Sequence, residues 1–210
     1  AGASADWPQE AEWAEAWQRA QQSPAATLDW LTAVSLLPQD FQRSKQRDVI
    51  VGLLAPHHPL TVRQRAIETF VVITDRQQET FELLAPFVSQ AEYRIQAVRT
   101  LLGIPTKLRD PRVSAELLNV LVKYAEATPT AQRTTDSFLD AMQLADQLLA
   151  RIPGSDSRAY RNRLREISVR VVRIHTVEEE MRYDLSHFAV EAGRPVQVVL
   201  KNEDLMPHNL

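Results

Sequence analysis

The sequence of 210 residues contains no cysteine, and this absence excludes several kinds of site. Without a thiol the chain forms no disulfide, no zinc–thiolate centre and no cysteine nucleophile. Glycine is scarce too, with only five residues. No Gly-rich phosphate loop, His-Glu-x-x-His or Gly-x-Ser-x-Gly motif occurs. The sequence therefore shows no catalytic constellation, and whether the chain is part of an enzyme stays open.

Long apolar runs and an excess of positive charge are missing as well. No apolar run reaches the roughly 18 residues that indicate a membrane span. Residues 1–165 carry 19 basic and 19 acidic side chains, and residues 166–210 carry 5 and 8, which gives the formal net charge of −3. Neither part has the basic surface typical of nucleic-acid-binding proteins. We therefore expect no membrane span and no nucleic-acid partner.

A helical pattern repeats along the first part of the chain. The tetrapeptide LLAP occurs twice, thirty residues apart, and Arg63 and Ala66 recur thirty-one residues later as Arg94 and Ala97. Paired helices that repeat at such a period are typical of α-solenoids, and this stretch resembles HEAT repeats. We expect a helical-repeat domain over residues 9–153, after a lead-in of residues 1–8, with both alanines facing a neighbouring helix. An irregular helical bundle is the alternative.

Tryptophans mark the first expected helix. Trp13, Ala16, Trp17 and Ala20 recur at i, i+3, i+4 and i+7, which gives one apolar helical face. We interpret these tryptophans, together with Trp7, as a core-packing stripe, with a platform for a ligand as the alternative.

Two further features follow in the helical part. The adjacent His57 and His58 lie in a turn without a third metal ligand at suitable spacing, so we do not expect a metal site there. A long helix is expected over about Thr130–Ile152, and residues 154–165 are read as a linker or a short helix.

From Ile167 onward the apolar residues alternate with polar ones, which indicates half-buried strands. We place a domain boundary near residue 165 for this reason. Gly193-Arg194-Pro195 separates two later alternating runs as a turn. The alternating apolar residues are Ile167, Val169, Val171, Ile174, Phe188, Val190, Val196, Val198 and Leu200.

The end of the chain resembles the first half of a cupredoxin, the Greek-key β-sandwich that holds type 1 (blue) copper. The resembling stretches are Phe188–Gly193, Val196–Asn202 and Pro207-His208-Asn209. The resemblance implies that His208 is the first copper ligand and that Asn209 ties the ligand loops together by hydrogen bonds. A type 1 site also needs a Cys, a second His and usually an axial Met, which this stretch does not supply. We therefore expect residues 1–210 alone to hold no blue copper.

Together these patterns predict an α+β chain of two domains, an α-solenoid followed by a partial antiparallel Greek-key sandwich over residues 166–210. A second polypeptide or a continuation of the chain is expected to supply the missing strands and ligands. The resemblance implies a periplasmic or secreted bacterial copper protein that transfers electrons, with a cytochrome c or a dehydrogenase module as its redox partner. The alternative is a non-catalytic interaction scaffold whose cupredoxin-like module binds without metal.

Overall fold

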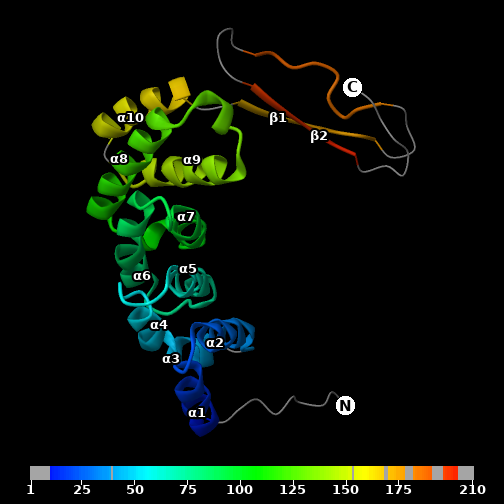
Figure 1. The fold of residues 1–210 in the computed structure, drawn as a ribbon. Coiled ribbons are helices and arrows are strands. Elements are labelled where there is room, and N and C mark those ends of the chain that lie inside the picture. Colours follow the sequence, from blue (N-terminus) through cyan, green and yellow to red (C-terminus); the bar gives the residue numbers. More distant parts are fainter. Residues whose placement is uncertain are drawn as a thin grey trace. The chain divides into compact units, whose positions relative to one another are not determined.

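The computed structural model describes residues 10–38, 40–152, 154–167, 170–177, 182–190 and 196–202 (Figure 1). The chain splits into two compact units, and the division falls inside helix α8, between Leu117 and Leu118. The helices are α1 (Glu10–Ala20), α2 (Pro24–Leu36), α3 (Asp40–Lys45), α4 (Arg47–Gly52), α5 (Leu60–Thr69), α6 (Gln77–Leu84), α7 (Arg94–Leu102), α8 (Pro111–Ala127), α9 (Asp136–Leu149) and α10 (Gly154–Ile167). Short 3-10 turns lie at Phe70–Val72, Ala85–Ser89, Thr106–Leu108 and Thr130–Gln132, and the strands are β1 (Arg170–His175) and β2 (Val196–Lys201).

The first unit is a stack of short helices. Helix α1 packs on α2, α2 packs on α5, and α5 packs on α7, so that α2, α5 and α7 form one row (Figure 1). All regular elements in the described residues between 10 and 152 are helical, as the periodicity predicts. Ser23 begins α2 by accepting a hydrogen bond from the Ala26 N–H at 3.2 Å, and Pro24 occupies the first helical position, where no N–H is needed.

The two copies of the thirty-one-residue repeat in the sequence fall in α5 and α7. Ala66 and Ala97 are both completely buried, which confirms that they face neighbouring helices. Thr69 and Thr100 are 2% exposed, and the Thr100 hydroxyl donates to the Ile67 carbonyl at 3.0 Å, which links the two repeats directly. The repeat therefore preserves small buried side chains, whereas the contact between helices is made by Thr100, because the Thr69 hydroxyl donates to the Arg65 carbonyl of its own helix.

Arginines supply donors to the carbonyl groups that precede the helices of this stack. The Arg63 Nε donates to the Leu54 carbonyl at 2.9 Å, and the Arg94 Nε donates to the Val88 carbonyl at the same distance. Arg109 is 1% exposed and donates to the Ile104 carbonyl at 2.7 and 3.0 Å. Helix ends leave carbonyl groups without partners inside the helix, so these guanidinium groups satisfy acceptors that would otherwise be buried and unpaired.

The second unit contains a small helical core. Ala125, Phe138 and Ile167 are buried together, with Tyr124 and Met142 packed against them. The expectation of one long helix over about Thr130–Ile152 is wrong at its start.

The cause is a helix cap inside the expected span. Thr135 has an extended backbone and accepts a hydrogen bond from the Phe138 N–H, so α9 begins only at Asp136. Residues 154–167 form α10, and Arg163 joins it to Glu126 through two hydrogen bonds of 2.9 Å.

The two strands overturn the predicted antiparallel Greek-key sandwich. Strand β1 pairs with β2 in parallel, from Arg170 opposite Val196 to His175 opposite Lys201, and the described residues contain only this two-stranded sheet. An antiparallel bridge joins Thr176 to Tyr183, so the chain first turns back after β1.

The error has a topological reason. Parallel neighbours need a connection that returns to the starting end of the first strand, and alternation of residue types carries no information about strand direction. The run at Phe188 and Val190 is not a strand, and these side chains are 40% and 51% exposed. Val172 and Ile174 of β1 are buried at 7% and 5% exposure.

Replacing Ala97 by Leu is expected to overpack the seam between α5 and α7. Ala97 has no exposed surface, and added methylenes in a close-packed core cost about 1–3 kcal/mol. Chemical denaturation measures this loss as a lower midpoint. Ala14→Leu is the matched control, because Ala14 lies exposed on α1. Equal midpoints for the parent chain and Ala97→Leu would contradict the packing described here.

Replacing Arg109 by Leu is expected to destabilise the first unit strongly. The Ile104 and Leu101 carbonyls would lose buried donors, and each buried acceptor left unsatisfied costs about 1–3 kcal/mol. Arg112→Leu serves as the control, since the Arg112 side chain is 77% exposed and pairs with Glu116 on the surface. Denaturant unfolding measures the free energy of unfolding of both variants. Similar decreases for the two would show that the burial of Arg109 is unimportant.

Candidate functional site

The two residues assigned to copper by resemblance, His208 and Asn209, lie outside the described residues. The described residues that precede them most closely in the sequence lie at the end of β2. There Asn202 accepts a hydrogen bond from the Thr176 hydroxyl at 3.2 Å. The other histidines of this part, His175 and His187, form local contacts. His187 contacts the Ser186 hydroxyl at 3.1 Å, and the backbone N–H of His175 donates to Asp184.

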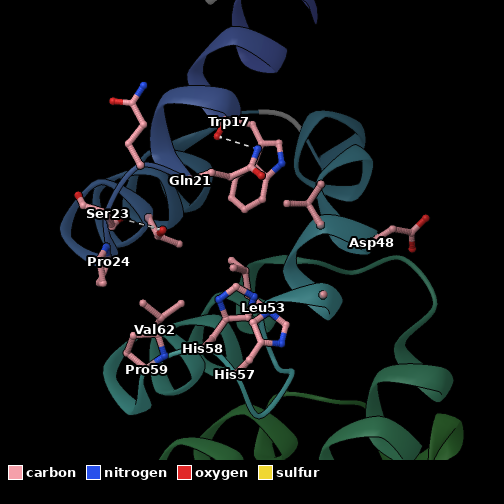
Figure 2. Close-up of a pocket in the computed structure, with 14 residues that line it drawn as sticks. Trp17, Gln21, Ser23, Pro24, Asp48, Leu53, His57, His58, Pro59 and Val62 are labelled. Atoms are coloured by element: carbon pink, nitrogen blue, oxygen red, sulfur yellow. Dashed lines mark hydrogen bonds between the residues drawn. The ribbon is translucent and has the colours of Figure 1, made fainter.

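A cavity of about 590 Å³ lies within the first unit, between the α1–α2 turn and the loop that precedes α5 (Figure 2). Trp17 of α1 borders it on one side, and His57 and His58 border it on the opposite side. Leu53 and Val62 contribute apolar walls. The cavity therefore brings together two features that the sequence separates by forty residues, the tryptophan stripe and the histidine pair.

The loop that carries the histidines is held at both of its ends. The His58 N–H donates to the Ala55 carbonyl at 3.1 Å, which forms a tight turn. Arg63 donates to the Leu54 carbonyl and stacks its guanidinium 4.5 Å from the centre of the Tyr93 ring. Pro59 precedes the first residue of α5 with an extended ψ of 148°. The loop is thus positioned by the next repeat.

The imidazole rings of His57 and His58 touch each other, with centroids 4.1 Å apart and planes tilted by 42°. In a turn, unlike in a helix, adjacent side chains can lie side by side. Burial, and then the neighbouring His57 and Arg63, lower the pKa of His58 below its ordinary value. At neutral pH the His58 ring is therefore uncharged and offers one N–H donor and one nitrogen acceptor.

Other polar groups of the cavity are already engaged. The Ser23 hydroxyl caps α2, and the Thr27 hydroxyl donates to the Ala20 carbonyl at 2.9 Å. Asp48 points away from the histidines in Figure 2 and pairs with Arg76 at 3.0 Å. Nothing here activates a hydroxyl nucleophile by placing it next to a histidine.

No group of three or more His, Asp or Glu side chains that could hold a metal ion occurs in the part of the chain that the structure describes. An indole, from Trp17, and the two imidazole rings of His57 and His58 border the cavity.

Sequence reasoning missed Trp30. Its ring contacts those of Trp13 and Trp17, and the three residues form a tryptophan cluster. Trp30 is 4% exposed and its ring lies 4.8 Å from that of Trp17 and 6.5 Å from that of Trp13. The prediction of a packing stripe for Trp13 and Trp17 is confirmed in part, because both also line surface cavities. The spacing of Trp30 from Val34 and Leu37 was the signal that could have placed it in the core.

No family model, curated protein or solved structure matches this chain. Among the helices that the structure describes, none is long and apolar enough to cross a membrane.

Replacing His57 by Gln is expected to raise the pKa of His58, because a nearby imidazole that can become positive is removed. NMR titration of the imidazole protons of His58 in the parent chain and in the variant measures this change. An unchanged or lower pKa for His58 would contradict the contact between the two rings.

The lowered pKa of His58 also determines whether its contribution to the stability of the fold rises or falls with pH. His58 binds its proton more weakly in the folded chain than in the unfolded chain, so its contribution to stability falls as the pH drops below about 6.5. His57→Gln should weaken this part of the pH dependence.

Proposed function

We propose that this chain is the helical scaffold of an extracytoplasmic electron-transfer copper protein, in which His208 is the first copper ligand. The single observation that supports this proposal is the run that ends in Pro207-His208-Asn209 and directly follows strand β2. In the family that this stretch resembles, the histidine of Pro-His-Asn is the first copper ligand, and that role would fall on His208. Asn209 would restrain the ligand loops by hydrogen bonds.

The residues of this chain do not complete a type 1 site by themselves. Blue copper needs a thiolate, and the sequence has no cysteine. The apolar side chains of the β part favour completion by more polypeptide, because Phe188, Val190 and Val198 are 40%, 51% and 44% exposed. Further strands that cover these side chains would bring the remaining Cys, His and Met ligands. A cytochrome c or a dehydrogenase module would then exchange electrons with the copper.

An interaction scaffold without metal is the second candidate, and the stack of helices in the first unit favours it. Arrays of paired helices present extended surfaces on which partners bind. The cavity between Trp17 and the histidine pair adds a recess with aromatic and apolar walls to this unit.

The test is made on the protein as its natural host produces it, together with any polypeptide that accompanies this chain. We expect copper in the purified protein and the intense visible absorption of a copper–thiolate bond. His208→Ala should abolish this absorption, whereas His187→Ala should keep it, because His187 is an exposed histidine of the same part. A host-produced protein without copper, or a band that survives His208→Ala, would refute the copper proposal and leave the scaffold as the function.

A further inference from the structure

A second surface cavity, the α1–α2 groove, runs between the first two helices and has a volume of about 910 Å³. Trp13, Ala16 and Ala20 of α1 line one wall, and Ala26, Trp30 and Ala33 of α2 line the other. These positions recur at helical spacing on both helices, so each helix presents one continuous apolar stripe to the groove.

The walls of the groove combine small residues with fixed aromatic rings. The alanines leave space between the helices, and the indole of Trp30 is held by an edge contact with Trp13 and a tilted ring contact with Trp17. At the end of α2 the side chain of Leu36 is 69% exposed, the largest exposure among the large apolar side chains that the structure describes. An apolar groove next to an exposed leucine is typical of a surface that a partner covers.

The shape of the groove favours a helix as its occupant. The side-chain ridges of α1 and α2 border a depression in which the side chains of a third helix can interdigitate. Amphipathic helices bind in such grooves through apolar anchors at the same spacing.

The rim of the groove determines the charge of that helix. Glu12, Glu15 and Asp29 surround it together with one base, Arg19. Three carboxylates against one guanidinium favour a partner with Lys or Arg beside its apolar face. The same charges disfavour a two-fold dimer through this groove, because each acidic rim would then face its own copy.

We infer that the α1–α2 groove is a docking site for a basic amphipathic helix of a partner protein. The apolar face of that helix lies on the alanines and tryptophans, and its basic side chains lie opposite Glu15 and Asp29. This inference is independent of copper at His208, since every residue that carries it belongs to the first unit.

The experiment uses the whole chain and a synthetic Leu/Lys helical peptide of about 14 residues, roughly four turns. Tryptophan fluorescence and calorimetry report binding. We expect the Leu/Lys peptide to bind at least about tenfold more tightly than a Leu/Glu peptide of the same pattern. Raising the salt concentration should weaken the complex, because exposed charge pairs are screened.

Two pairs of variants separate specific docking from general attraction. Glu15→Lys with Asp29→Lys should weaken binding by about tenfold, whereas Glu82→Lys with Glu92→Lys changes the net charge equally and should leave the affinity within about twofold. Ala33→Arg should block the groove, and Ala14→Arg, on an exposed face of α1, should not. Circular dichroism confirms that each variant folds.

The inference fails if both peptides bind equally well, or if the control charge reversal weakens binding as much as the rim reversal. It also fails if the chain forms dimers in sedimentation experiments that Ala33→Arg abolishes, because the occupant would then be a second copy.

Discussion

The carbonyl groups at the C-terminal ends of the short helices need hydrogen-bond donors, and the stacking in the first unit depends on how the chain supplies them. Helices α4 to α7 have between 6 and 10 residues, so a large fraction of their backbone lies at an end. Arg63, Arg94 and Arg109 each reach back to carbonyls that precede the next helix. Thr27 makes the same kind of contact with the Ala20 carbonyl at the start of the stack.

These contacts also explain why a buried arginine is tolerated. Burial lowers the pKa of Arg109, which reflects the free-energy cost of placing a charge among apolar side chains. Its hydrogen bonds to the Ile104 and Leu101 carbonyls offset that cost. Arg47 is likewise 4% exposed and is compensated by Glu79 at 3.4 Å. The first unit thus uses guanidinium groups as connectors between helices.

Two cavities arise from the way α1 and α2 meet each other and their neighbours. The cavity beside His57 and His58 forms where the α1–α2 turn meets the loop before α5, and the α1–α2 groove lies between the two helices themselves. Trp17 borders the first and Trp13 borders the second, while Trp30 packs against both indoles. The tryptophan cluster is therefore part of the core and of two surfaces at once.

Much of the helical part could be read from the sequence. Helical periodicity and the recurrence of Arg63 and Ala66 as Arg94 and Ala97 determined which residues face a neighbour, because a repeat must keep small side chains where helices touch. The strand at Val196–Lys201 followed from its alternation. The direction of strand pairing did not, since apolar alternation is the same in parallel and antiparallel sheets.

The cavity beside His57 and His58 and the α1–α2 groove could be predicted from the sequence less well than the helices. The sequence by itself determined that no thiolate chemistry is available and that His208 follows a strand, because these depend only on composition and order. Only the fold decided that His57 and His58 touch each other and face Trp17, and that alanines from two helices form one groove between acidic side chains. Contacts between residues distant in sequence depend on how the helices stack, and periodicity identifies the face of each helix but not the face that it meets.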